Sequence, residues 1–203
     1  MAERGDGPLA THLYFDRKYK TEAVRVLPGE YYATSRDMLL ATVLGSCVTA
    51  CIRDKQNGIG GMNHFMLPRG CIDENDPSSM PARYGIYAME ILINQVIKIG
   101  ARRANLEAKV FGGGNVLPGL VEVNVGERNA EFVLNFLETE SIPVVAHDLV
   151  DIYPRKVYYF PSTGKALVKK LRDLPNSAIV EREKDFGSNL SKARVSGDIE
   201  LFS

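Results

Sequence analysis

The alternation of apolar and polar positions along the chain indicates many short strands and two strong helices. Between Tyr84 and Gly100, apolar residues recur at three- and four-residue steps, the spacing of one face of an α-helix. A second pattern of this kind covers Asn129 to Glu140. Short apolar segments bounded by turn residues favour strands at 24–27, 31–34, 39–44, 48–52, 106–111, 142–146, 155–160 and 166–171, with another around His64.

These elements predict a single layered α+β domain. Because only two helical patterns interrupt the strands, we expect mixed or antiparallel β-sheets packed together and flanked by helices. The wide apolar surface of the 84–100 helix predicts that it covers a sheet. We expect the domain to span residues 24–175. Residues 1–23 predict an N-terminal extension, and the polar residues 176–203 predict a mobile C-terminal tail.

Composition and charge exclude several classes of protein. The 203 residues include 25 basic and 25 acidic side chains, so no net field directs the chain to nucleic acid or anionic lipid. Three cysteines without framework spacing argue against a secreted disulfide scaffold. The N-terminus lacks a signal-peptide core, and the longest nearly apolar run, 39–52, is shorter than the roughly 18 residues of a membrane span. We expect a soluble cytoplasmic protein.

A cysteine and a histidine lie on the two strands of a predicted hairpin. Cys47 follows a Gly45–Ser46 turn between two apolar runs, and His64 comes 17 positions later beside a Gly-Gly pair. Pairing of the two strands across the polar turn 53–58 would bring thiol and imidazole together. A thiol and an imidazole are the two groups that catalysis by a cysteine nucleophile with a histidine base requires. The alternative is that both are structural residues, as isolated cysteines in apolar segments usually are.

The chain also offers four soft metal ligands: Cys47, Cys51, His64 and Cys71. Structural zinc sites usually draw on close pairs such as C-x2-C, whereas this set is spaced C-x3-C-x12-H-x6-C. Cys47 and Cys51 are four positions apart on a predicted strand, which separates them by about 13 Å. One metal ion cannot bind both, so zinc is a minor alternative and we expect no cofactor.

The predicted 155–171 hairpin has two features with competing interpretations. Its Ser162–Lys165 turn looks like the end of a phosphate-binding loop, but Tyr159 and Ala166 stand where that loop needs glycine and serine or threonine. Turn chemistry explains the segment better. The hairpin also gathers the basic residues Arg155, Lys156, Lys165, Lys169, Lys170 and Arg172. They form either a solvated strand face or a surface that steers an acidic partner.

Four motifs, in order along the chain, resemble the chemoreceptor glutamine deamidase family of bacterial chemotaxis (CheD). They are LGSCV at 44–48, GGMNHFMLP at 60–68, FGGG at 111–114 and VYYFPSTGK at 157–165. The closing GDIELF at 197–202 is similar to the tail of many members. The resemblance implies a fold shared with cytotoxic necrotizing factor toxins. It also implies an enzyme that converts glutamine side chains of chemoreceptor helices to glutamate, and a CheC-type chemotaxis phosphatase as a further partner.

Deamidation requires attack on an unreactive amide carbon and departure of ammonia. Cys47 is the expected nucleophile and His64 the expected general base and acid. The family uses a threonine just before the cysteine to orient the histidine, which here implies Thr42. Backbone N–H groups around Cys47 are the expected oxyanion donors. Ser46 either donates to the oxyanion or caps the turn, and the turn role is favoured.

The surroundings of the expected site are predicted in less detail. Asn63 and the Gly112–Gly114 turn are expected to line the pocket, and residues 69–81 to form a surface loop near it. His12 and His147 are expected to be structural or solvated. The basic hairpin would steer a glutamate-rich receptor segment, with its Ser162–Thr163 turn near the substrate glutamine.

Two other functions are compatible with these residues. A methylesterase acting on receptor glutamyl methyl esters uses the same acyl chemistry, and the sequence does not separate it from a deamidase. An adaptor that only binds a CheC-type phosphatase would need neither a thiol nor an imidazole. Retention of both Cys47 and His64 therefore favours the enzyme.

Overall fold

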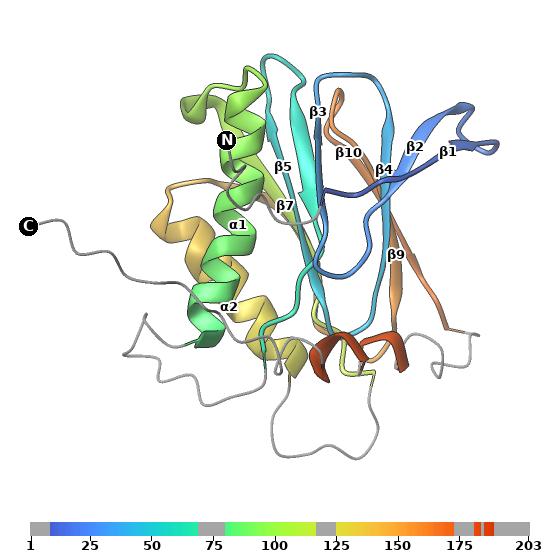
Figure 1. Cartoon of the computed structure of the whole chain (residues 1–203), viewed down its shortest axis with the longest axis vertical. Coiled ribbons are helices and arrows are strands. Elements are labelled where there is room, and N and C mark those ends of the chain that lie inside the picture. The colour runs from blue at the N-terminus through green and yellow to red at the C-terminus, as the bar shows by residue number, and fades with distance from the viewer. Residues whose placement is uncertain (1–8, 69–79, 117–124, 173–180, 184, 189–203) are drawn as a thin grey trace, which may run out of the picture.

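The computed structural model describes residues 9–68, 80–116, 125–172, 181–183 and 185–188. Two five-stranded sheets pack face to face, and two helices cover the outer face of one of them (Figure 1). The layers are therefore helix, sheet and sheet. This arrangement confirms the α+β class with mixed sheets flanked by helices.

The first sheet has the strand order β1-β2-β4-β9-β10. Its strands are β1 (His12–Asp16), β2 (Thr21–Arg25), β4 (Leu39–Leu44), β9 (Arg155–Phe160) and β10 (Lys165–Lys170). β2 and β4 are parallel, and the other neighbours are antiparallel. The predicted β9–β10 hairpin is confirmed. Because β1 and the start of β2 are paired into this sheet, we expect the domain to begin before residue 24.

The second sheet has the strand order β3-β6-β5-β7-β8. Its strands are β3 (Tyr31–Thr34), β6 (Gly60–Asn63), β5 (Val48–Asp54), β7 (Leu106–Gly112) and β8 (Val144–Leu149). Only β7 and β8 run parallel. The hairpin predicted around the 53–58 turn is confirmed as β5–β6. The strand predicted at 142–146 lies further along the chain, because Pro143 precedes the pairing and His147 is inside β8.

Both predicted helices are present and begin earlier than the apolar pattern suggested. They are α1 (Met80–Lys98) and α2 (Val125–Thr139), with a short 3-10 helix, η1 (Arg103–Asn105), before β7. Gly100 ends α1 as predicted, with a φ of +114° that favours glycine. Its N–H donates to the Ile97 carbonyl at 2.9 Å, and the Ala101 N–H donates to the Val96 carbonyl at 3.2 Å.

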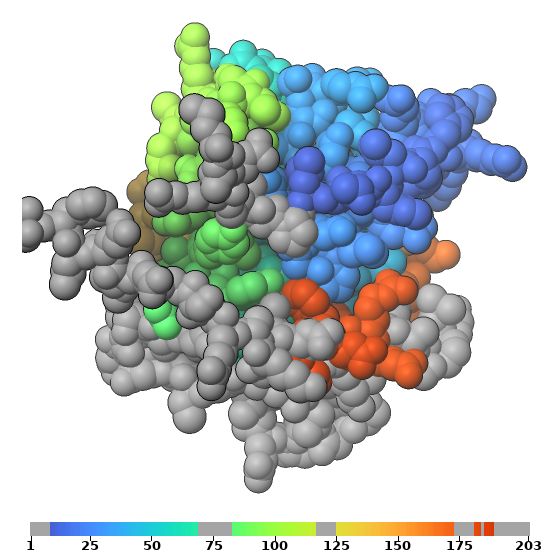
Figure 2. Space-filling model, in the orientation of Figure 1, coloured from blue at the N-terminus to red at the C-terminus, as the bar shows by residue number. Residues whose placement is uncertain are grey.

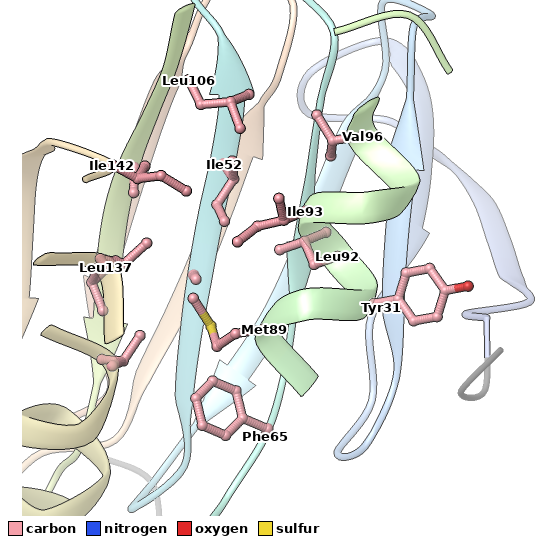
Figure 3. Packing of buried hydrophobic residues seen from close by; sticks show 14 of the residues in the cluster. Tyr31, Ile52, Phe65, Met89, Leu92, Ile93, Val96, Leu106, Leu137 and Ile142 are labelled. Atoms are coloured by element: carbon pink, nitrogen blue, oxygen red, sulfur yellow. The ribbon is translucent and has the colours of Figure 1, made fainter. Parts of the chain in front are cut away.

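Two apolar cores lie between the three layers. In the outer one, Met89, Leu92 and Ile93 of α1 face Ile52 of β5 (Figure 3). In the inner one, between the sheets, Cys51 belongs to the same cluster as residues of β4 and β9. β5 is thus buried on both faces, which explains why residues 48–52 form a continuous apolar run rather than an alternating one.

Some predicted features fall outside the described residues. These include Cys71, most of the 69–81 loop and the closing GDIELF motif. Among the described residues, no helix has the length and the apolar character needed to cross a membrane.

Candidate active site

The turn at residues 45–47 carries the chain from one sheet to the other. β4 of the first sheet ends at Leu44, and β5 of the second sheet begins at Val48. Cys47 therefore lies where the two sheets meet, with its side chain in the inner core and fully buried.

The pairing register of the second sheet brings His64 to the same place. Val48 and Phe65 exchange backbone hydrogen bonds of 2.9 and 3.0 Å just beyond the end of β6. In this register Cys47 and His64 are diagonal neighbours on the face that looks toward the first sheet. Cys47 Sγ and a His64 ring nitrogen lie within 4.8 Å of each other. The two residues singled out from the sequence are thus brought together.

Thr42 reaches His64 from the opposite sheet. The Thr42 hydroxyl donates to the Val26 carbonyl at 2.7 Å and lies 2.8 Å from His64 Nδ1. A hydroxyl has one proton, which Thr42 donates to Val26, so the Thr42 oxygen must accept a hydrogen bond from the Nδ1–H group of His64. The lone pair is then on Nε2, which has no hydrogen-bond partner among the described residues. An imidazole in this tautomer has its basic nitrogen available to a thiol.

The backbone of the 45–47 turn is oriented by its carbonyl groups. The Gly45 and Cys47 carbonyls accept hydrogen bonds of 2.8 Å each from the N–H groups of Gly114 and Gly113. The Ser46 carbonyl accepts one of 2.8 Å from the Asn129 side chain. With all three carbonyls bound on one side, the N–H groups of residues 45–47 can converge on the other. Successive N–H groups of this kind form an anion-binding nest.

Gly112 shows how closely the β7 end approaches this turn. A β-carbon at Gly112 would lie 2.2 Å from the Cys47 carbonyl oxygen, and its φ is +118°. Only glycine tolerates both conditions. The FGGG motif is therefore required by the close packing of β7 against the cysteine turn.

A carboxylate occupies the nest. Glu183 Oε1 accepts from the N–H groups of Gly45 at 2.8 Å and Cys47 at 3.2 Å. Glu183 Oε2 accepts from the Ser46 N–H at 2.8 Å and from the Ser46 hydroxyl at 2.7 Å. Glu183 is only 5% exposed. It belongs to a helical segment, residues 181–183 and 185–188, that lies against the lower end of the sheets (Figure 1, red) and at the surface (Figure 2).

The electrostatics of this arrangement keep the thiol and the imidazole neutral. Burial raises the pKa of the Cys47 thiol well above its usual value, and the nearby Glu183 charge raises it further. Burial also lowers the pKa of His64 to about 4, although Glu183 and the Val26 carbonyl partly oppose that shift. A cysteine nucleophile must be a thiolate when it attacks. The site is therefore not primed in this arrangement, chiefly because the thiol and the imidazole are buried.

Cys47, His64 and Glu183 could also be considered as a metal site, since their ligand atoms lie within 4.8 Å of one another. Zinc accepts thiolate, imidazole and carboxylate ligands. However, the Glu183 oxygens already accept from N–H and O–H groups whose dipoles point their positive ends into the site. Such donors attract anions and repel cations. The geometry favours an anion-binding site.

Ser46 and Asn63 have roles different from those favoured from the sequence. Ser46 was expected to cap the turn, but its hydroxyl joins the donors around the carboxylate. Asn63 was expected to line the pocket, but its side chain binds the Ala50 N–H at 2.9 Å and the Ala88 carbonyl at 3.0 Å, on the helix side of the sheet. The cause is strand alternation, which directs Asn63 and His64 to opposite faces.

The other candidate residues lie away from the site or take no part in it. Cys51 is buried further along β5, and burial raises the pKa of its thiol. His12 and His147 are exposed, as expected. Ser162 packs against Gly58 in the β5–β6 turn, at the far end of the seven-residue β5, about 20 Å from Cys47. The expectation that the Ser162–Thr163 turn lies near the substrate is therefore wrong.

Arg155 does not belong to the basic face of the hairpin. Its side chain is fully buried and donates to the Gly112 carbonyl at 2.9 Å. It also contacts the Val150 and Asp148 carbonyls and forms an ion pair of 3.2 Å with the Asp148 carboxylate. Arg155 therefore ties β9 to the end of β7, while Lys165, Lys169 and Lys170 are exposed.

Two residues that position the site were missed by the sequence analysis. Asn129 is fully buried on α2, and its amide joins the Ser46 carbonyl to the Leu67 N–H at 2.8 and 2.9 Å. A polar residue on the apolar face of a predicted helix was the signal that could have found it. Glu183 lies in a polar segment that has no distinguishing pattern, so no signal pointed to it.

Comparison with known proteins places these features in a family. A solved structure, of the Bacillus licheniformis hypothetical protein YfiH, shares 12% identity and a TM-score of 0.35 over 60% of this chain and 49% of its own, too little to support an argument. The sequence profile described as "CheD chemotactic sensory transduction" matches residues 66–170.

Curated relatives match over the whole length. Proteins named "Probable chemoreceptor glutamine deamidase CheD" from Janthinobacterium sp. (strain Marseille) and Herminiimonas arsenicoxydans are 62% and 59% identical, each over 100% of both chains. The protein of the same name from Ralstonia nicotianae is 52% identical over 100% of this chain and 88% of its own. The chain with the buried Cys47–His64–Thr42 cluster therefore belongs to the CheD family.

Proposed function

We propose that this protein is a chemoreceptor glutamine deamidase, which converts glutamine side chains of receptor helices to glutamate and releases ammonia. Cys47 is the nucleophile, His64 is the general base and acid, and Thr42 positions the imidazole. The names of the full-length relatives support the reaction and the receptor substrate. The residue roles rest on the geometry of the site.

The first half of the reaction forms a thioester. Nε2 of His64 takes the thiol proton, and Cys47 Sγ attacks the amide carbon of the substrate glutamine. The carbonyl oxygen becomes an oxyanion, which the N–H groups of the 45–47 turn and the Ser46 hydroxyl stabilise. Collapse of the intermediate breaks the carbon–nitrogen bond, and His64 returns the proton to the departing ammonia.

The second half releases the product. A water molecule, deprotonated by His64, attacks the thioester carbon and forms a second oxyanion in the same nest. The carbon–sulfur bond then breaks and His64 returns its proton to the sulfur, which leaves a glutamate side chain on the receptor and a free Cys47 thiol. No cofactor is needed, because water is the only co-reactant.

The observation that carries this proposal is the anion nest beside the thiol. Gly45, Ser46 and Cys47 hold a carboxylate through four hydrogen bonds of 2.7 to 3.2 Å, next to a cysteine and a histidine of defined tautomer. A buried structural cysteine needs no such donors. Acyl-transfer chemistry requires them, because charge develops on the substrate oxygen.

The test is mass spectrometry of a receptor cytoplasmic fragment incubated with this protein. We expect the mass change of an NH2-to-OH exchange at defined glutamines, with release of ammonia. Cys47→Ala should abolish the reaction while the protein stays folded, and Cys51→Ala, a matched buried cysteine, should remain active. Full activity of Cys47→Ala would show that another residue is the nucleophile.

Methylesterase activity is the second candidate, because a methyl ester offers the same carbonyl to the same nest. Two receptor fragments assayed in parallel, one with glutamyl methyl esters and one with glutamines, would separate the two activities. Methanol release would show methylesterase activity, and ammonia release would show deamidation. We also propose that a CheC-type phosphatase is a partner, that the protein works in the cytoplasm, and that its fold is shared with cytotoxic necrotizing factor toxins. Each of these is an expectation from the family resemblance.

A further inference from the structure

The Glu183 side chain is the same chemical group that the proposed reaction leaves on its substrate. Hydrolysis of the thioester produces a glutamate carboxylate beside Cys47, with an oxygen in the N–H nest. Glu183 has its carboxylate in that nest, with one oxygen on Gly45 and Cys47 and the other on Ser46. Cys47 Sγ and a Glu183 carboxylate oxygen lie within 4.8 Å of each other as well. The arrangement is that of an enzyme with its product bound.

We propose that residues 181–188 are an internal product mimic, which closes the active site until a receptor helix displaces it. This inference rests on the proposed function, because Glu183 mimics a product only if the reaction forms glutamate. It also defines the substrate class: a helical segment that presents its glutamine from one face, as the 181–188 segment presents Glu183.

Three residues on one face of the segment contact the domain. Glu183, Phe186 and Gly187 are spaced i, i+3 and i+4, so they lie on the same side of a helix. The Phe186 ring packs on Gly29, where a β-carbon would lie 2.9 Å from it. Gly187 is buried on Met66, since a β-carbon there would lie 2.9 Å from the Met66 methyl group.

These contacts lie on both sides of the candidate histidine. The Gly29 N–H donates to the His64 carbonyl at 2.7 Å, and Met66 is two residues after His64 on the same face. The segment therefore packs against residues next to His64 while its carboxylate fills the nest at Cys47. A substrate that uses the same nest must take the same position.

The segment is suited to release. A helix of this length is marginal by itself in water, so it depends on its few contacts with the domain. Its burial also holds Cys47 as a neutral thiol, and departure of Glu183 would remove the charge that opposes the thiolate. Displacement would then open the nest and, in the same step, remove the carboxylate charge that adds to the effect of burial on the thiol.

Glu183→Gln turns the mimic into a substrate and is the decisive variant. Cys47 Sγ would attack the side-chain amide carbon introduced at position 183, ammonia would leave, and water would hydrolyse the thioester to regenerate Glu183 and the thiol. We expect the purified full-length variant to change in mass by one NH2-to-OH exchange at residue 183, at a rate independent of protein concentration. Cys47→Ala/Glu183→Gln should keep its glutamine, which excludes spontaneous deamidation.

Glu183→Ala tests whether the segment blocks the site, without requiring Cys47 to react with residue 183. We expect iodoacetamide to label Cys47 about tenfold faster than in the parent, as measured by peptide mapping. Receptor deamidation should accelerate by about the same factor, which equals roughly 1.4 kcal/mol. Phe186→Ala should have the same effects, because it removes the contact with Gly29 but keeps the charge. Glu181→Ala, at an exposed glutamate of the same segment, is the matched control and should leave both rates unchanged.

The outcomes separate this inference from the proposed function. If the parent deamidates the receptor but Glu183→Ala is no faster in labelling or turnover, the product-mimic inference is overturned. Persistence of the glutamine in Glu183→Gln with Cys47 intact would overturn it too. A loss of activity in Glu183→Ala would instead make Glu183 a catalytic residue, which also contradicts the inference. If no variant acts on the receptor, the proposed substrate is wrong, while Cys47 labelling and the mass of Glu183→Gln still decide the inference.

Discussion

Replacing Thr42 with valine removes one oxygen atom from the buried series of hydrogen bonds that joins Val26, Thr42 and His64. The change preserves side-chain shape and burial, since Thr42 and His64 are 1% and 2% exposed. It deletes two hydrogen bonds, of 2.7 Å to the Val26 carbonyl and of 2.8 Å to His64 Nδ1. The perturbation is therefore confined to hydrogen bonding.

The size of the effect follows from what the remaining groups can do. Each lost hydrogen bond is worth about 0.5–1.5 kcal/mol net. His64 Nδ1 already lies 3.4 Å from the Val26 carbonyl and can turn toward it, which satisfies both groups in part. We expect the free energy of unfolding to fall by about 1–2 kcal/mol. The same turn moves Nε2 away from Cys47, so we expect kcat to fall about 10- to 100-fold, or roughly 1.4–2.7 kcal/mol of transition-state stabilisation.

The assay combines deamidation kinetics on a receptor fragment with urea unfolding of the same preparations. KM should stay near the parent value, because Thr42 is not placed to touch substrate. Thr42→Ser, which keeps the hydroxyl, should recover most of kcat even though it loses a methyl group. A Thr42→Val enzyme with the parent kcat, or a serine variant as impaired as the valine variant, would refute the positioning role of Thr42.

Two further predictions concern the supports of the site and of the second sheet. Asn129→Ala should lower kcat by about 100-fold, the effect of losing an oxyanion donor, because the Ser46 carbonyl loses its hydrogen bond to α2. Asn135→Ala, at an exposed position of α2, is the control. An unchanged kcat for Asn129→Ala would exclude a role for Asn129 in positioning the turn. Burial alone would raise the pKa of Asp54, but N–H donors from Arg102, Gln56 and Asn57 outweigh it and hold that pKa well below its usual value. The stability that this carboxylate contributes is present above its unfolded pKa of about 3.9 and is lost as the pH falls toward the folded value. Asp54→Asn should therefore destabilise the protein more at neutral pH than at acid pH in urea unfolding, and an equal loss at both would contradict the assignment.

The sequence by itself determined the parts of this protein that depend on local pattern. The period of apolar residues located both helices, and Gly100 located the end of α1, because a left-handed residue is needed there. The polar 53–58 turn between two apolar runs determined the β5–β6 hairpin. At the open end of that hairpin, the proximity of Cys47 and His64 follows from the register, since strand alternation decides which residues share a face.

Only the tertiary structure decided how the two sheets meet. Thr42 and His64 belong to different sheets, so their contact requires the packing of one sheet on the other. Asn129 anchors the cysteine turn from α2, and Arg155 leaves the basic hairpin face because its guanidinium binds carbonyls at the end of β7. These partners are far apart along the chain, and periodicity carries no information about them.

Glu183 is the extreme case of a residue whose role depends on distant parts of the chain. It lies more than a hundred positions from Cys47, in a segment whose polar composition predicted a mobile tail. Its burial depends on N–H groups that converge only after the carbonyls of residues 45–47 are bound by β7 and α2. A charged side chain is buried where donors compensate its desolvation, and such a set of donors exists only in the folded protein.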